Sequence, residues 1–316
     1  MTKIIEAHGL TKHFGKTKAL DGIDIEVEEG TVLGVLGPNG AGKTTAVRIL
    51  ATLLRPDSGT ATVAGFDVVH QSTQVRRIIG LTGQYASVDE DLTGVENLVM
   101  IGQLLDLSAP QARARATELL EEFDLTDAGK RLAKTYSGGM RRRLDLAASL
   151  IGRPQVVFLD EPTTGLDPAK RDDVWGMIRA LVAQGTSVML TTQYLEEADA
   201  LAHDITVIDH GKVIAHDTPQ GLKRQVGGQT LDVRVVSLAD LERVTALLAS
   251  VGTRAPEHPA PDLVSVPVSG DAALTTVVAA LAAEHIAVTE LSLRLPSLDE
   301  VFYSLTGHTE ETEVAA

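Results

Sequence analysis

Short, continuously apolar runs alternate with amphipathic segments along the first two thirds of the chain. Three of these runs are TVLGVLG, QVVFLDE and SVMLTT, which end at residues 37, 161 and 192. Runs of this kind, bounded by polar residues, are typical of strands buried on both faces of a parallel sheet. Segments with helical spacing and charged faces lie between them. The pattern therefore predicts an α/β fold in which helices cover a mixed or parallel sheet through βαβ crossovers.

Two other stretches of the first part depart from this alternation. Residues 2–30 read as extended, hairpin-forming chain, which predicts an antiparallel β subdomain at the start of the protein. From about residue 92 to residue 151 the apolar spacing becomes helical. Thr93 is suited to cap the first of these helices, and Pro110 falls where the first turn of another helix accepts proline. We interpret residues 92–151 as a helical insertion.

The pattern of apolar and polar residues changes after residue 225, which we take as the end of the first domain. Residues 230–307 alternate between strand and helix patterns, with a proline-rich loop expected at residues 256–261. This pattern predicts a small C-terminal α/β domain. Residues 308–316 are expected to form an acidic tail.

Composition narrows the classes of function that are possible. Hydrophobic residues make up 44% of the 316 positions and aromatic residues only 3%, so the core must be aliphatic. The chain has no cysteine, which excludes disulfides, thiol catalysis and cysteine-ligated metal. A net charge of −15 argues against general affinity for nucleic acid. No apolar run is long enough to cross a membrane and no signal peptide is recognisable, so the expected location is cytosolic.

The nonapeptide GPNGAGKTT carries the strongest chemical signal. It follows an apolar run, precedes a helical pattern and matches the phosphate-binding loop of Gly, four residues, Gly, Lys and Ser or Thr. Its glycines allow backbone N–H groups to wrap a phosphate at a helix N-terminus, Lys43 can reach the β- and γ-oxygens, and Thr44 offers a hydroxyl to Mg²⁺. The alternative is a glycine-rich turn that happens to hold a lysine. The predicted nucleotide-binding residues of this loop are Gly37, Pro38, Asn39, Gly40, Ala41, Gly42, Lys43, Thr44 and Thr45.

Two acids end the second apolar run. Asp160 is expected to hold Mg²⁺ through water, and Glu161 to polarise the water that attacks the γ-phosphate. The alternative is a pair of solvated acids at the end of a strand. Together with the phosphate loop, the two residues predict a site that hydrolyses a nucleotide with the help of Mg²⁺. The loop alone does not distinguish GTPases, kinases, helicases and transporters.

The segment TYSGGMRRRLDLAASL indicates which kind of nucleotide enzyme this is. Ser137 is suited to cap a helix that opens with two glycines, which makes a second anion-binding helix start. Arg141, Arg142 and Arg143 oppose the helix dipole there, so an acid or an anion should lie near them unless they form a solvated face. In a head-to-tail dimer, each such helix start could complete the nucleotide site of the other subunit.

The order of GPNGAGKTT, Gln84, YSGGM, VVFLDEP and GLDP resembles the nucleotide-binding subunits of ATP-binding cassette transporters, over about residues 1–222. A narrower resemblance, to the daunorubicin-resistance exporter ATPases of actinomycete antibiotic producers, lies in the segments TGQYASVDEDLTG, TTQYLEEAD and SLDEVFYSLTGH. That narrower likeness extends into the C-terminal domain. It implies a P-loop ATPase core and a homodimer that sandwiches ATP.

The resemblance also implies roles for individual residues. Phe14 would stack on adenine, and Gln84 would touch Mg²⁺ and the attacking water. Asp167 would run across the dimer interface. The N-terminus of the capped helix would cover the γ-phosphate bound by the opposite protomer, through Ser137, Gly138 and Gly139. Each role has a local alternative: Phe14 as a core aromatic, Gln84 as a surface amide and Asp167 as a turn former beside Pro168.

Two features depart from the wider family. In YSGGM, Tyr136 and Met140 stand where leucine and glutamine are usual, and Gln193 stands where most cassette ATPases have histidine. A glutamine at the end of its strand can donate an N–H to the γ-phosphate, but it cannot titrate or carry positive charge. We therefore expect Gln193 to sense the γ-phosphate and Glu161 alone to act as the base. The alternative is that the amide of Gln193 caps the helix that follows.

The resemblance implies an ATP-hydrolysing subunit at the cytoplasmic face of the membrane, working with a separately encoded permease. Its expected task is export of a hydrophobic antibiotic of anthracycline or polyketide type. A lipid is the alternative cargo. Other classes are a soluble cassette ATPase of translation or DNA repair, for which the chain lacks a second phosphate loop, and a non-hydrolytic regulator, against which Lys43, Asp160 and Glu161 argue.

Overall fold

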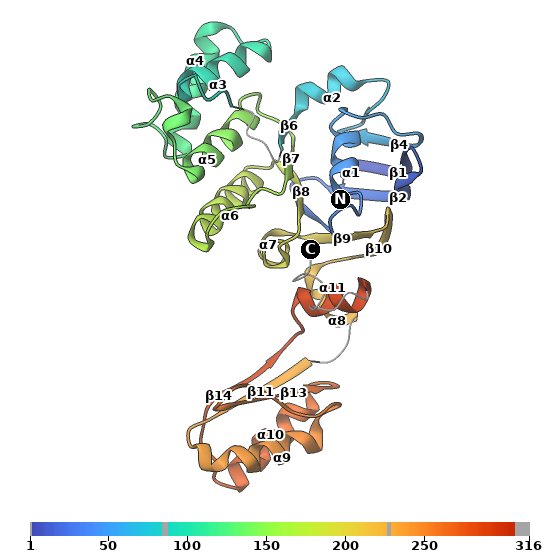
Figure 1. Ribbon diagram of the computed structural model, residues 1–316, viewed down its shortest axis with the longest axis vertical. Helices are drawn as coiled ribbons and strands as arrows, with labels where there is room; N and C mark the ends of the chain where they lie inside the picture. Colours follow the sequence, from blue (N-terminus) through green and yellow to red (C-terminus); the bar gives the residue numbers. More distant parts are fainter. Residues whose placement is uncertain (1, 84–87, 226–228, 307–316) are drawn as a thin grey trace. The chain divides into compact units, whose positions relative to one another are not determined.

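Figure 1 shows a computed structural model of the chain that describes residues 2–83, 88–225 and 229–306. Contacts divide the chain into two compact units, residues 1–218 and 219–316. The helix α8 (Pro219–Gln225) thus belongs to the second unit.

A six-stranded sheet forms the centre of the first unit, in the order β10-β9-β3-β8-β7-β6. Every residue of β3, β7 and β8 is buried, because helices and a second sheet cover both faces. The five strands from β9 to β6 pair in parallel, and β10 adds an antiparallel edge. The predicted α/β fold with a mixed sheet is confirmed. The strands are β3 (Val32–Leu36), β6 (Ile79–Thr82), β7 (Val156–Asp160), β8 (Ser187–Thr192), β9 (Asp204–Asp209) and β10 (Lys212–Asp217).

The second sheet of this unit is antiparallel, as predicted for the start of the chain. Its order is β2-β1-β4-β5, and β1 and β2 form a long hairpin. Apolar residues of β1, β2 and β4 form one continuous core with β3 and with α1 (Lys43–Leu50). The sheet therefore fixes the strand and helix on either side of the phosphate loop. Its strands are β1 (Lys3–Phe14), β2 (Thr17–Glu28), β4 (Ser58–Val63) and β5 (Phe66–Asp67).

The predicted helical insertion contains α3 (Gly94–Leu104), α4 (Ala109–Glu122) and α5 (Gly138–Ser149). Thr93 caps α3 as expected: its hydroxyl accepts from Glu96 N at 3.2 Å, and Glu96 Oε2 accepts from Thr93 N at 2.8 Å. Proline lies in the first turn of α4, also as expected. The remaining helices of the unit are α2 (Ser72–Ile78), α6 (Pro168–Ala183) and α7 (Leu195–Leu201).

The second unit contains a four-stranded antiparallel sheet in the order β12-β13-β11-β14. Helices α9 (Leu241–Val251) and α10 (Ala272–Ala283) share a core with it. The strands are β11 (Gln229–Val235), β12 (Glu257–Ala260), β13 (Leu263–Val268) and β14 (Val288–Arg294), and α11 (Leu298–Thr306) follows them.

The loop expected at residues 256–261 is wrong in part, because residues 257–260 form β12. This strand lies at an edge of the sheet and pairs only with β13. Pro259 is tolerated there because an edge strand leaves one side without ladder hydrogen bonds.

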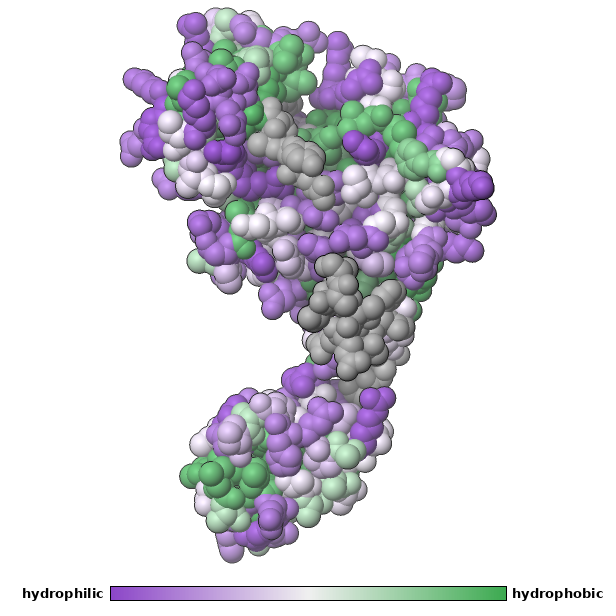
Figure 2. All heavy atoms as spheres, in the orientation of Figure 1, coloured by the Kyte–Doolittle hydropathy of each residue, from purple (hydrophilic) through white to green (hydrophobic). Residues whose placement is uncertain are grey.

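Most large apolar side chains are inside the units, and Figure 2 shows hydrophilic residues over much of the visible face of the first unit. None of the helices within the described ranges combines the length and the apolar content needed to span a bilayer.

Candidate functional site

The phosphate loop joins β3 to α1 and lines a cavity of about 230 Å³. Gly42 has φ of 113°, a region that side chains rarely occupy, and a Cβ there would lie 2.4 Å from the carbonyl oxygen of Ala19. Only glycine fits this position without moving the backbone of β2. The lining consists of Ala19, Asn39, Gly40, Ala41, Gly42, Lys43, Thr44, Thr45 and Glu161. The structure thus brings the loop and one of the two predicted acids to the same cavity.

Lys43 is only 5% exposed although it carries a charge. Its Nζ donates to the carbonyl oxygens of Gly37 at 2.6 Å and Pro38 at 3.1 Å. Burial lowers the pKa of this ammonium, and the charges of Glu161 and Asp160 oppose that shift. The ammonium therefore donates to carbonyl oxygens of the phosphate loop. Phosphate oxygens of a bound nucleotide can accept the same N–H groups instead.

Asp160 ends β7 beside two hydroxyl groups. Its Oδ1 accepts from Thr44 Oγ1 at 3.3 Å and from Thr191 Oγ1 at 2.5 Å. Carboxylate and hydroxyl oxygens are hard ligands of the kind that Mg²⁺ takes, together with water and substrate phosphates. The donor set at the end of the phosphate loop fits the predicted ion.

Glu161 has an unusual backbone, with φ of 52° in a residue that is not glycine. Such a conformation costs roughly 1–3 kcal/mol and persists only where the surroundings hold it. Its N–H donates to the carbonyl oxygen of Thr191 at 3.0 Å and lies 3.2 Å from the hydroxyl of the same residue. Its Oε2 accepts from Thr164 Oγ1 at 3.1 Å. The strained backbone turns the chain out of β7 and leaves the carboxylate at the cavity.

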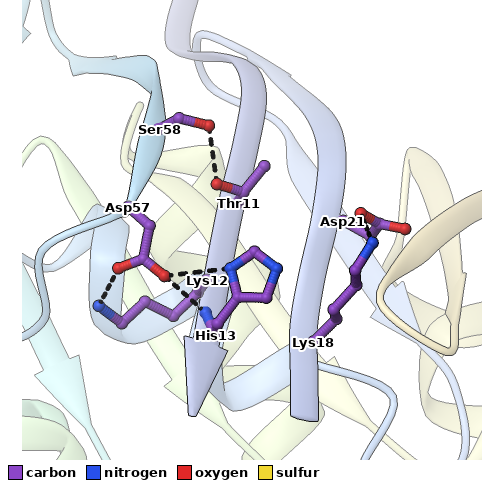
Figure 3. Close-up of polar contacts among 7 residues, drawn as sticks. All are labelled: Thr11, Lys12, His13, Lys18, Asp21, Asp57 and Ser58. Atoms are coloured by element: carbon purple, nitrogen blue, oxygen red, sulfur yellow. Dashed lines mark hydrogen bonds and ion pairs between the residues drawn. The ribbon is translucent and has the colours of Figure 1, made fainter. Parts of the chain in front are cut away.

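Phe14 ends β1 and is 51% exposed, so the alternative of a core aromatic is wrong. Its ring lies 5.9 Å from Lys12 Nζ. Figure 3 shows how this end of the hairpin is held: Asp57 accepts from Lys12 Nζ and from the backbone N–H of His13, each at 2.7 Å. The hydrogen bond from Lys12, followed by that from His13, lowers the pKa of Asp57 to about 2. The network fixes the strand that presents an open aromatic face.

Ser137 caps α5 as predicted, because its hydroxyl accepts from Met140 N at 3.3 Å. A Cβ on Gly138 would point into open space, while a Cβ on Gly139 would lie 3.1 Å from Lys170 Cδ. Ser137, Gly138 and Gly139 are not among the residues that line the phosphate-loop cavity of their own chain.

The three arginines of α5 are all paired, so the alternative of a solvated face is wrong. Arg141 contacts Glu90 at 2.7 Å, and Arg143 contacts the carbonyl oxygen of Phe123 and a carboxylate oxygen of Asp124, each at 3.3 Å. Arg142 instead donates to the carbonyl oxygen of Glu161, the predicted catalytic acid, at 3.3 Å.

Asp167 is the N-cap of α6. Its Oδ1 accepts from the backbone N–H of Lys170 at 3.0 Å, and its Oδ2 pairs with Lys170 Nζ. The expected local role in the turn before Pro168 is therefore present. Lys170 also packs beside Gly139, so the starts of α5 and α6 are neighbours within one chain. A role for Asp167 across a dimer interface stays a prediction.

Gln193 lies between β8 and α7 with its side chain exposed. The alternative that it caps α7 is wrong: the N-cap residue is Tyr194, and the hydroxyl of Thr192 accepts the N–H of Tyr194 at 2.9 Å. In the described part of the chain, the amide of Gln193 makes no hydrogen bond and is free to reach a ligand. Gln84, predicted to touch Mg²⁺ and water, falls outside the described residues.

Sequence reasoning missed Thr191 and Arg142. Thr191 bonds both predicted acids, and the polar pair that ends the run SVMLTT was the available signal. Arg142 was treated only as one of three like charges, and nothing in the spacing distinguishes it from its two neighbours.

Comparisons with known proteins agree with this geometry. Residues 20–164 match the family model of the ABC transporter. The chain is 59% identical to the daunorubicin resistance ATP-binding protein DrrA2 of Streptomyces coeruleorubidus, over 98% of this chain and 97% of that one. It is 52% identical to the daunorubicin/doxorubicin resistance ATP-binding protein DrrA of Streptomyces peucetius, over 100% and 97%. The crystal structure of a nucleotide-free ATP-binding cassette from an ABC transporter superposes with a TM-score of 0.64 at 24% identity, covering 69% of this chain and 92% of that one.

Proposed function

The chain belongs to the ABC transporter ATPases, in the branch of the daunorubicin- and doxorubicin-resistance ATP-binding proteins, and from this membership we propose that it powers export of a hydrophobic antibiotic. It is an ATPase whose hydrolysis is coupled to transport. The proposed cargo is an anthracycline or a related polyketide, carried by a separately encoded permease. The observation that carries the proposal is the similarity to drug-resistance relatives over nearly the whole chain, the second unit included.

We assign the hydrolytic chemistry to the phosphate-loop cavity. Backbone N–H groups of Gly40 and Gly42 and the ammonium of Lys43 would hold the phosphates. Thr44 and Asp160 would hold Mg²⁺, which neutralises charge on the phosphate oxygens when bound. Glu161 would orient the attacking water and accept its proton. The support is that all these residues except Asp160 line one cavity, and that Asp160 contacts Thr44.

We further propose that two copies of the chain form the working dimer at the cytoplasmic face of the membrane. In this arrangement the start of α5 in one protomer covers the γ-phosphate bound by the other, through Ser137, Gly138 and Gly139. Two observations support the idea: these residues do not line the cavity of their own chain, and a Cβ on Gly138 would point into open space. Phe14, exposed at the end of β1, would stack on adenine.

Inverted membrane vesicles that contain the chain and its permease test the transport proposal. We expect ATP-dependent accumulation of a fluorescent anthracycline, and no accumulation in vesicles that carry Glu161→Gln. Vesicles with the permease alone serve as the control. ATP turnover stimulated by a lipid, with no drug accumulation, would instead support the alternative cargo.

Gln193 gives a second test, because its exposed amide is proposed to donate to the γ-phosphate. Loss of one hydrogen bond to a charged group corresponds to about 10- to 100-fold lower turnover in Gln193→Ala. Gln193→His, which keeps a donor, should retain most of the activity. Steady-state phosphate release measures both, and Gln74→Ala, at an exposed amide on α2, is the matched control. Wild-type turnover in Gln193→Ala would exclude the sensor role.

A further inference from the structure

Arg142 connects α5 to the two loops that leave the catalytic edge of the sheet. Its Nε donates to the carbonyl oxygen of Pro162 at 2.6 Å, Nη1 to that of Gly83 at 3.2 Å, and Nη2 to that of Glu161 at 3.3 Å. The side chain is only 16% exposed. One guanidinium thus binds three main-chain carbonyls from two segments that are far apart in the sequence.

Two of these carbonyls belong to segments that matter for hydrolysis. Glu161 is the proposed base, and its left-handed backbone needs contacts that hold the peptide in place. Thr191 holds its N–H, and Arg142 holds its carbonyl oxygen. Gly83 directly precedes Gln84, the residue predicted to approach Mg²⁺. The contacts of Arg142 therefore bear on the position of the catalytic carboxylate.

Buried acids surround this guanidinium. Asp145, one turn further along α5, contacts Nη1 at 3.3 Å and is itself buried. Burial lowers the pKa of Arg142, while the charges of Asp145, Glu197 and Asp160 raise it, and a guanidinium in such surroundings stays charged. Glu197 lies on α7, and its Oε1 accepts from Trp175 Nε1 of α6 at 3.2 Å. Arg142 is thus a fixed part of the interior and not a mobile surface cation.

We propose that Arg142 is a positioning residue that couples the two nucleotide sites of the dimer. The inference rests on the proposed function, in which the start of α5 contacts the nucleotide bound by the partner. Ser137 and Arg142 are five residues apart, about 7.5 Å along one helix. A shift of α5 toward the partner's nucleotide moves the guanidinium and, with it, the carbonyl of Glu161. Each chain thereby adjusts its own base to the nucleotide held by the other.

The neighbouring arginines provide matched controls. Arg143 lies on the same helix and also carries one charge, but it contacts Phe123 and Asp124 near the end of α4. A lysine keeps the charge at either position and loses the planar set of donors. In Arg142→Lys, the ammonium cannot reproduce all three hydrogen bonds to the carbonyl oxygens. Arg143→Lys changes no contact of Glu161.

Mixed dimers with a single hydrolytic site test the coupling. Two differently tagged chains are purified together with the permease: a silent chain with Glu161→Gln, and an active chain with Glu161 intact. Arg142→Lys is then placed in one chain or the other, and Lys43→Met in the silent chain empties the site that α5 of the active chain contacts. A misplacement of about 1 Å can cost about 100-fold in rate, so we expect kcat to fall at least about 10-fold when the active chain carries Arg142→Lys, and to stay near wild type when the silent chain carries it, with KM for ATP unchanged. Emptying the silent site should lower kcat when Arg142 is intact and should change it little further when the active chain carries Arg142→Lys. Arg143→Lys should change neither constant.

Three outcomes would overturn the coupling: no loss when the active chain carries Arg142→Lys, the same further loss on emptying the silent site whether or not the active chain carries Arg142→Lys, or an equal loss with Arg143→Lys. Thermal unfolding of each purified complex checks the fold, and Arg142→Gln replaces the lysine variant if that one unfolds early. Failure of the proposed function is seen separately. It would appear as absent turnover in the wild-type dimer, or as full turnover when both chains carry Glu161→Gln.

Discussion

Glu161→Gln is expected to lower ATP turnover by about 10²- to 10⁴-fold, the range that loss of a positioned general base produces. Glutamine keeps the size of the side chain and the hydrogen bond from Thr164 Oγ1, but it cannot accept a proton from water. Nucleotide binding should persist, because Lys43 and the loop backbone are unchanged. Phosphate release and binding of a fluorescent ATP analogue measure the two effects independently.

The matched control for this substitution is Glu196→Gln, at an exposed acid on α7. It should retain wild-type turnover. If Glu161→Gln hydrolyses ATP at the wild-type rate, Glu161 is not the base. If it loses binding as well, the substitution disturbs the loop and the role of the carboxylate must be assigned otherwise.

Lys43→Met should abolish binding at physiological ATP concentrations. Methionine occupies similar space but removes a charged donor, and each lost hydrogen bond to a charged phosphate oxygen costs about 1.5–3 kcal/mol. Loss of two such bonds weakens affinity by about 10²- to 10⁴-fold. Equilibrium titration with a fluorescent ATP analogue measures the change. Lys130→Met, at an exposed lysine of the helical insertion, is the control.

Loss of Lys43 also leaves the carbonyls of Gly37 and Pro38 without their buried donor. A thermal unfolding curve without nucleotide therefore accompanies the titration. A folded Lys43→Met protein that binds ATP with wild-type affinity would contradict the assignment of this lysine to the phosphates.

The phosphate-binding part of the site could be predicted because its chemistry depends on consecutive residues. The lysine at position 43 has its effect within one loop, and Asp160 and Glu161 end a strand that the apolar pattern already identifies. The caps at Thr93 and Ser137 are equally local, and the structure confirms both.

Features that depend on distant partners could not be predicted in this way. Arg142 acts through carbonyls of residues 83, 161 and 162, which only the folded chain brings to it. The N-cap of α7 is Tyr194 and not Gln193, because the helix begins one residue later than the sequence suggests. Pro259 allows a strand because β12 is at an edge, a fact about the order of the sheet and not about the segment itself.

The left-handed backbone of Glu161 lowers the stability of the fold, while the side chain at the same position is proposed to be needed for activity. Glycine at this position would relieve the penalty of roughly 1–3 kcal/mol, but it would remove the carboxylate. Selection for a stable fold alone would therefore favour loss of the acid, and only selection for turnover retains it. In a lineage that no longer needs hydrolysis, position 161 should be among the first of the cavity to drift toward glycine or asparagine.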